Sequence, residues 1–414
     1  MEPNTIEFEQ LIEKGCGIDV HKETAVATVQ GKGIKTETRT FSTFTSSLKD
    51  MKEWLISIGI THIAMESTGV YWKPIFNILE DAFEILLVNA RHLKNVPGRK
   101  TDKADSRWIC KLLISGLLKG SFVPLENIRE LRDLSRYRSK LTGQIASEKN
   151  RIQRILEDAN IKLSSVVTDT SGVVATKLIE GLIAGRKDLD VLINECYHGK
   201  LSASKEELKE ALTGRLTAHH AFMLKQMKAH IIYLESQIAL IDEEMDNKLA
   251  EYNNQLALLQ TIPGVGRDGA RGILSEIGAN MEVFPNEQHL SSWAGICPGN
   301  NESAGKKKSS RTRHGNKYLK ALLVELACGA TRTKGTYFRA KYESMVGRRG
   351  KKKALLAIGH KILCASYYII KDKVPYQELG ANYLLERKKK NKIDYLKRQL
   401  KELGYNVEKI EKAA

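Results

Sequence analysis

The sequence predicts an α/β domain at the N-terminus, followed by a helical arm and a helical C-terminal domain. Three observations support this order. Strand-like and helix-like apolar patterns alternate at the start, an apolar repeat with helical spacing runs through the middle, and Gly and Pro interrupt helical patterns near the end. The expected domain limits are 1–124, 125–256, 257–346 and, for a basic helical tail, 347–414.

The N-terminal domain is predicted to have the element order βββαβαβα. Alternating or continuous apolar runs indicate its strands, and apolar residues three and four positions apart indicate its helices. The expected strands are 17–20, 25–30, 34–41, 62–65 and 84–88. The expected helices are 47–58, 71–79 and one that begins near Thr101, whose hydroxyl can cap it.

Four carboxylates lie at the ends of these elements. Asp19 and Glu66 end the first and fourth strands, which are neighbours in such a sheet, and Asp102 and Asp105 share one helix face at spacing i, i+3. Each alone is typical of a surface charge, but an unpaired carboxylate that ends an apolar strand is costly. Such oxygen ligands select Mg²⁺ or Mn²⁺, which can clamp the oxygens of a phosphodiester. We therefore predict a shared metal site.

The middle of the chain contains apolar residues that alternate three and four positions apart. This spacing is typical of a coiled-coil seam. The seam residues are Leu224, Met227, Ile231, Leu234, Ile238, Ile241 and Met245. A single seam does not identify its partner, so both a helical hairpin within one chain and a dimer interface remain open.

The charge of the chain is concentrated at its C-terminal end. The net charge is +17 overall, but residues 305–414 hold 29 basic and 9 acidic residues, or +20, while residues 1–304 hold 37 and 40, or −3. A block of this kind suits phosphate contacts and predicts a nucleic-acid partner, although a solvated basic tail is the plainer alternative.

Other compositional features exclude several classes. No apolar run approaches the roughly 18 residues of a membrane span, and the acidic N-terminus lacks a signal-peptide core, so a cytoplasmic protein without membrane contact is expected. Six cysteines occur without a Cys-x-x-Cys pair, which favours neither a zinc site nor a disulfide framework.

Two motifs in the C-terminal half suit contact with DNA. The segment Leu259–Gly266 has the form of a helix-hairpin-helix, in which Gly264 and Gly266 would let backbone N–H groups approach a phosphate; an ordinary helix–helix turn is the alternative. Further on, Ser303 lies beside a set of cations that could offset phosphate charge: Lys306, Lys307, Lys308, Arg311 and Arg313. The chemistry alone leaves open whether Ser303, Ser309, Ser310 or no serine is a nucleophile.

Five ordered motifs together resemble one known family. They are Gly17-Ile18-Asp19-Val20-His21-Lys22, Met65-Glu66-Ser67-Thr68-Gly69, Lys100-Thr101-Asp102-Lys103-Ala104-Asp105, and the segments 262–266 and 295–305. The sequence resembles the "one-ten" insertion-sequence transposases, the RNA-guided bridge recombinases, and in particular their longer subgroup. The resemblance extends from about residue 15 to 322 and leaves the middle arm and the tail without a matching motif.

The resemblance implies an RNase H-like, resolvase-like N-terminal domain in which Asp19, Glu66, Asp102 and Asp105 bind Mg²⁺. It implies that Ser303 is the nucleophile of DNA strand cleavage and exchange, through a covalent serine–DNA intermediate. It also implies a structured non-coding guide RNA, a homo-oligomer (dimer or tetramer) with active sites shared between subunits, and a bacterial or archaeal mobile element.

Two other functions compete with this interpretation. One is a metal-dependent nuclease of the Holliday-junction type, in which water attacks the phosphodiester and Ser303 is structural. The other is a non-catalytic nucleic-acid-binding protein whose acidic residues are surface charges. A covalent protein–DNA adduct would separate the transposase from the nuclease, and metal dependence would separate both from the binding protein.

Overall fold

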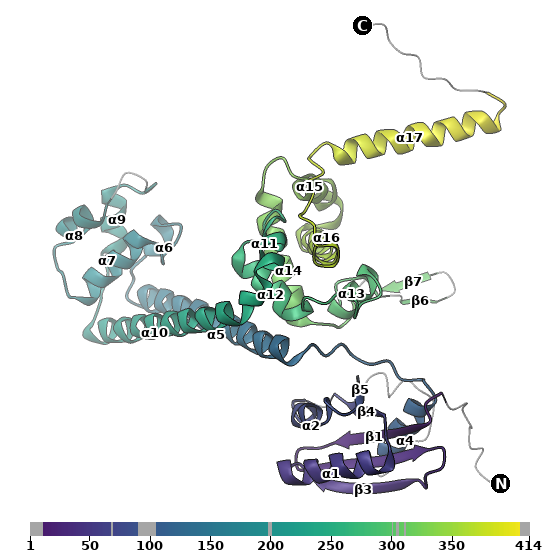
Figure 1. Cartoon of the computed structure of the whole chain (residues 1–414). Coiled ribbons are helices and arrows are strands. Elements are labelled where there is room, and N and C mark those ends of the chain that lie inside the picture. The colour runs from purple at the N-terminus through teal and green to yellow at the C-terminus, as the bar shows by residue number, and fades with distance from the viewer. Residues whose placement is uncertain are drawn as a thin grey trace. The chain divides into compact units, whose positions relative to one another are not determined.

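The computed structural model describes residues 11–67, 69–89, 105–197, 201–299, 301–303, 306–309 and 312–405, and only the backbone between 301 and 309. The chain divides into two compact units, Met1–Val123 and Pro124–Ala414 (Figure 1).

The first unit has the element order that the sequence predicts. Its elements are β1 (Lys14–Val20), β2 (Thr24–Gly31), β3 (Glu37–Ser42), α1 (Thr45–Ile58), β4 (His62–Glu66), α2 (Trp72–Leu79), β5 (Glu84–Val88) and α4 (Asp105–Ile114). Strand β3 begins three residues later than expected, because Gly31 and Gly33 both adopt positive φ and lengthen the turn before it. The expected helix start near Thr101 lies outside the described residues.

The sheet is mixed, with strand order β3-β2-β1-β4-β5. Strands β1, β2 and β3 pair antiparallel, whereas β4 runs parallel to both β1 and β5. Helices α1 and α2 bury their apolar residues against one face of the sheet. Helix α4 packs on the other face, where Ile109, Leu112 and Leu113 contact Ala64 and Val88. This layered α/β arrangement is consistent with the RNase H-like domain that the sequence predicts.

Two glycines in β1 allow α4 to lie directly on the sheet. Successive residues of a strand point to opposite faces, so Cys16 and Ile18 enter the core under α1 while Gly15 and Gly17 face α4. A Cβ on Gly17 would lie 2.3 Å from both the Ser106 carbonyl oxygen and the Cys110 amide nitrogen. The helix backbone therefore occupies the space that any larger residue at this position would need.

The second unit begins with two long helices that run antiparallel. Side chains of α5 (Glu126–Asp158) pair with side chains of α10 (Ala218–Leu249). Residues later in α5 pair with residues earlier in α10, as expected for antiparallel helices. The pairs are Glu130–Lys248, Arg138–Asp242, Glu148–His230 and Asp158–His220. The predicted seam contributes the buried residues Leu224, Leu234 and Met245. A helical hairpin within one chain is thus present, and its coiled-coil packing remains a prediction.

Short helices connect α5 to α10 and form a small core of their own. They are α6 (Leu163–Val166), α7 (Val173–Ile183), α8 (Leu189–Cys196) and α9 (Lys205–Leu212). Apolar side chains from these helices pack with Ile152 and Leu156 of α5 and with Leu224 of α10. The end of the arm is therefore a packed helical cap, which the sequence pattern did not resolve.

The rest of the second unit is mostly helical. Its elements are η2 (Ala250–Tyr252), α11 (Asn253–Gln260), α12 (Arg267–Ile277), α13 (Glu287–Ala294), β6 (Asn301–Ser303), β7 (Lys306–Ser309), α14 (Lys317–Arg332), α15 (Tyr337–Arg349), α16 (Lys351–Asp372) and α17 (Tyr383–Glu402).

Helix α16 lies in the range expected to form a basic tail, yet it is part of the core. Its apolar face, which includes Ile358, Ile362 and Leu363, is buried, and the helix packs against α11, α13, α14 and α15. In length and composition α16 could also span a membrane, but 56% of its most apolar window is buried inside the unit, which accounts for that composition. Helix α17, in the same range, is basic and has no buried residue.

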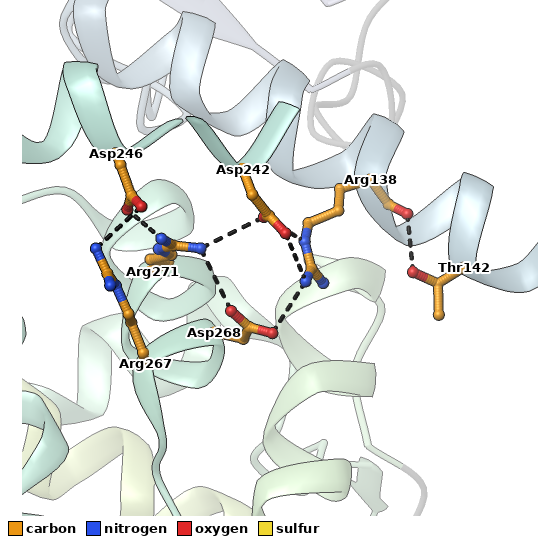
Figure 2. A network of polar contacts seen from close by, with 7 residues as sticks. All are labelled: Arg138, Thr142, Asp242, Asp246, Arg267, Asp268 and Arg271. Carbon is orange, nitrogen blue, oxygen red and sulfur yellow. Dashed lines mark hydrogen bonds and ion pairs between the residues drawn. The ribbon is translucent and has the colours of Figure 1, made fainter. Parts of the chain in front are cut away.

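An ion-pair network joins the arm to α12. Arg138 of α5 binds both carboxylate oxygens of Asp242 on α10, at 2.6 and 3.1 Å, and binds Asp268 of α12 at 3.0 Å. Arg271 of α12 lies between these helices with its side chain only 7% exposed, and it contacts Asp242, Asp246 and Asp268 (Figure 2). Because each charge has opposite partners on another helix, the network favours one relative position of α5, α10 and α12.

A second charged cluster, around Glu276, joins α5 to α12 and α14. The carboxylate of Glu276 is 3% exposed and binds Arg136 through two bonds of 2.8 and 2.9 Å. Arg132 donates to the Glu276 backbone carbonyl at 2.6 Å, and Asn316, the N-cap of α14, donates to the carboxylate. Burial lowers the pKa of Arg132 to about 10 although Glu276 opposes that shift. This cluster connects the start of α5 to the helix that follows the β6–β7 hairpin.

We predict that Gly17→Ala destabilises the first unit by about 1–3 kcal/mol, because the new methyl group must displace the α4 backbone. Chemical denaturation followed by fluorescence measures this loss. Gly120→Ala is the matched control, since its Cβ would meet Leu86 only at ordinary contact distances of 3.6–3.9 Å. Equal stability of the two variants would contradict the close approach of α4.

We also predict that Glu276→Gln lowers the free energy of unfolding by roughly 3–5 kcal/mol, because it removes the buried carboxylate charge that two partly buried guanidinium groups share. Glu343→Gln removes an exposed partner of Arg339 and should cost about 1 kcal/mol or less. A loss for Glu276→Gln as small as that of the control would show that this cluster does not hold the helices together.

Candidate active site

Two of the four predicted carboxylates lie side by side on the sheet. The parallel register pairs Ile18 of β1 with Met65 of β4, and Asp19 and Glu66 each follow one residue later. Both share the face of Gly17 and Ala64, the face that α4 covers. The local sequences explain this placement, because the alternate residues of both strands are apolar and enter the opposite core.

Asp105 of α4 lies within electrostatic reach of one of these carboxylates, Asp19. It is the first residue of that helix, and its negative charge contributes to raising the pKa of Asp19. Burial is the larger cause of the raised pKa, since the Asp19 side chain is only 14% exposed. His21 opposes the shift, because its Nε2 lies 3.1 Å from an Asp19 carboxylate oxygen. Asp19 and Asp105 therefore repel each other in a site with little solvent.

The donor set suits a hard divalent cation, although the described residues do not complete a site. Carboxylate oxygens are the ligands that Mg²⁺ and Mn²⁺ prefer, and an ion between Asp19 and Asp105 would relieve their repulsion. Among the residues that the structure describes, no three His, Cys, Asp or Glu side chains are close enough to hold a metal ion. Asp102, the remaining member of the predicted set, lies outside those residues.

Ser303 lies on a two-stranded hairpin in the second unit. Strands β6 and β7 pair antiparallel, with Ser303 opposite Lys306 and Glu302 opposite Lys307. Ser303 is thus the last residue of β6, and Lys308 lies in β7. Of the other predicted cations, Arg313 is exposed and Arg311 falls outside the described part of the chain.

Close backbone packing fixes the base of this hairpin. Gly295 ends α13 with a φ of 68°, and a Cβ on Gly315 would lie 2.4 Å from the Gly295 amide nitrogen. Pro298 and Thr312 form an additional bridge between the two chain segments. The glycines let these segments meet, so the hairpin projects from a defined point between α13 and α14 (Figure 1).

The predicted helix-hairpin-helix segment forms a turn between α11 and α12. Gly264 adopts a φ of 83°, and a Cβ there would lie 2.2 Å from the Ala330 amide nitrogen of α14. Gly264 is therefore required for packing against α14, whatever else it contacts. Gly266 has no atom within 4 Å of its Cβ position and precedes α12 as its N-cap. Contact of either glycine with a phosphate remains a prediction.

Several residues that support the site did not stand out in the sequence. Gly15 and Gly17 position α4, and their signal was the alternation of glycine with apolar residues directly before Asp19. His21 follows β1 directly, and its ring contacts the Asp19 carboxylate. The partners of Glu276 are distant in sequence, and no local pattern indicates them.

Comparison with known proteins gives an independent view of both units. A family model described as "Transposase", of the DEDD type found in IS110 elements, matches residues 16–161. A second model, described as "Transposase IS116/IS110/IS902 family", matches residues 256–343.

Two curated relatives are the pilin gene-inverting proteins of Moraxella bovis and Moraxella lacunata. Each is 28% identical to this chain over 195 residues, which cover 46% of this chain and 59% of the relative. The chain therefore matches somewhat more than half of the length of these relatives. The carboxylate-bearing domain and the serine-bearing domain both match transposase models in the expected order, so the chain belongs to the IS110 family of transposases.

Proposed function

We propose that this chain is a DNA transposase or recombinase that cuts and exchanges DNA strands through a covalent serine–DNA intermediate. The observation that carries the proposal is the placement of Asp19 and Glu66 at the same end of neighbouring parallel strands, on the sheet face that α4 covers. The transposase models and the pilin gene-inverting relatives both support DNA as the substrate.

Asp19, Glu66, Asp102 and Asp105 would hold the divalent cation, Mg²⁺ or Mn²⁺. When bound, the cation supplies positive charge that stabilises a phosphodiester during substitution at phosphorus. The protein limits the access of water to Asp19, and the paired strands β1 and β4 hold Asp19 and Glu66 in position. His21 holds one oxygen of Asp19 and so orients that carboxylate.

Ser303 would supply the nucleophile. Its hydroxyl oxygen forms a bond to phosphorus and loses its proton, the bond from phosphorus to the leaving DNA oxygen breaks, and that oxygen takes up a proton. The reverse substitution by the hydroxyl of another DNA end releases the serine and joins the new strands. The neighbouring strand β7, with Lys306, Lys307 and Lys308, brings positive charge to the same hairpin.

The partners of the reaction also belong to the proposal. We expect a structured non-coding RNA to guide target choice and a dimer or tetramer to share active sites between subunits, in the cytoplasm of a bacterium or archaeon. The resemblance to bridge recombinases supports the RNA and the oligomer. The net charge of +20 after residue 304 is compatible with both nucleic acids.

We predict that Ser303→Ala lowers the yield of a covalent protein–DNA adduct by more than about 1,000-fold, because the attacking oxygen is absent. The assay incubates the full chain with Mg²⁺, element-junction DNA and the RNA transcribed beside the gene, and then detects DNA-linked protein after denaturation. Ser309→Ala, on the opposite strand of the hairpin, is the matched control and should keep its adduct.

An unaltered adduct yield in Ser303→Ala would exclude this serine as the nucleophile. DNA hydrolysis by the wild type without any adduct would instead identify a nuclease of the junction-cleaving type.

We predict opposite effects of Asp19→Asn with and without metal. Without metal the variant should melt at a higher temperature than the wild type, because it removes a partly buried charge that Asp105 repels. With Mg²⁺ or Mn²⁺ the wild type should gain thermal stability by ligand binding, and the variant should gain much less, with affinity reduced by at least about tenfold. Thermal melts over a metal titration measure both effects.

Asp81→Asn serves as the control for this titration, because Asp81 is an exposed carboxylate of the same unit, paired with Lys52. It should keep the metal response of the wild type. If wild type, Asp19→Asn and Asp81→Asn respond alike to the metal, the carboxylates are not ligands and a non-catalytic nucleic-acid-binding protein becomes the better account.

A further inference from the structure

Five cations from three helices gather near the C-terminal end of the second unit. We call them the C-terminal cation cluster: Lys341 and Arg349 of α15, Lys361 of α16, and Arg387 and Lys388 of α17. Lys341 is partly buried at its centre, and burial lowers the pKa of this lysine. The positive charges of the other four cations lower it further, which places all of them within electrostatic reach of Lys341.

The C-terminal cation cluster differs in its ion pairs from the other charged clusters among the residues that the structure describes. None of the five cations forms an ion pair there, and Glu343, the acid nearest to Lys341 in α15, pairs instead with Arg339 at 2.9 Å. The arm junction of the same unit differs, since Arg136, Arg138 and Arg271 all bind carboxylates. Five like charges without partners destabilise the folded chain.

Packing between the helices holds the cations together. The ring of Tyr383, the first residue of α17, contacts that of Tyr337 in α15 edge-on at 5.7 Å. Phe338 stacks on Tyr376 at 5.5 Å, and Glu378 accepts a hydrogen bond from the Tyr337 amide at 2.7 Å. The segment that enters α17 is therefore fixed against α15, and Arg387 and Lys388 follow within the next two turns.

We propose that the C-terminal cation cluster binds the phosphate backbone of a nucleic-acid strand, at a site separate from the serine hairpin. When the cluster binds a nucleic acid, its cations take the place of the counterions at the phosphates. The phosphate charges then relieve the repulsion between the cations. Lysine and arginine side chains that meet only phosphates fix the position of a strand without reading its sequence. The inference rests on the proposed function only in taking nucleic acid as the substrate.

The test compares the full-length wild type with Lys341→Gln/Lys361→Gln in binding to labelled duplex DNA and to a labelled RNA hairpin. Fluorescence anisotropy over a salt series gives the affinity and its salt dependence for each probe. We expect binding of at least one probe to weaken equally for unrelated sequences, and the slope of log affinity against log salt to fall by about 1 per lysine, about 2 in all. The probe that responds identifies which strand, DNA or RNA, occupies the site.

Two controls separate charge from fold. Lys341→Arg/Lys361→Arg keeps the charges and should bind as the wild type does. Lys187→Gln/Lys225→Gln removes the same charge from the helical arm and should leave the slope of the responding probe unchanged. Without nucleic acid, Lys341→Gln/Lys361→Gln should melt at a higher temperature than the wild type, because it relieves the repulsion.

If Lys341→Gln/Lys361→Gln shows the same slope of log affinity against log salt as the wild type for both probes, the inference is wrong. A lower melting temperature of that variant would also overturn it, because it would show that the lysines stabilise the fold. At saturating DNA and RNA, the variant should still form the Ser303 adduct. The salt slope therefore tests the proposed cluster site, whereas the adduct yield tests the serine mechanism, so the two proposals can fail separately.

Discussion

The direct contact of α4 with β1 is the constraint on which the candidate site depends. Gly15 and Gly17 offer no side chain to the helix. The backbone of α4 lies where a Cβ of Gly17 would be, and side chains of Leu113 and Ile114 pack against Gly15. The contact brings Asp105, at the start of α4, within electrostatic reach of Asp19 in a site with little water. A site of this kind is unfavourable without a counter-charge, and this cost is the physical reason to expect a cation.

The second unit contains two kinds of charged cluster, one with ion pairs and one without them among the described residues. At the arm junction every buried cation has carboxylate partners, so the pairs around Arg271 and Glu276 fix helices relative to one another. At the C-terminal cation cluster no cation forms an ion pair within the described part of the chain, although aromatic packing fixes the helices that carry them. Ion-paired side chains fix helices relative to one another. Cations without ion-pair partners can instead exchange their counterions for the phosphates of a nucleic acid.

The sequence predicted what local patterns determine. All five strands and the helices of the first unit were expected from apolar periodicity, and the carboxylates at strand ends followed from the same pattern. The sequence could not show that α5 is the partner of the α10 seam or that α16 is a core helix, because both depend on contacts between distant segments. It also missed Glu276, since its partners Arg132, Arg136 and Asn316 lie on other helices.

Anomalous diffraction from crystals of the full chain grown with Mn²⁺ would test the central claim most directly. The account predicts a manganese peak bound by carboxylate oxygens of Asp19, Glu66 and Asp105, with Asp102 as a further ligand. A manganese ion bound elsewhere, with these carboxylates turned away from one another, would contradict it.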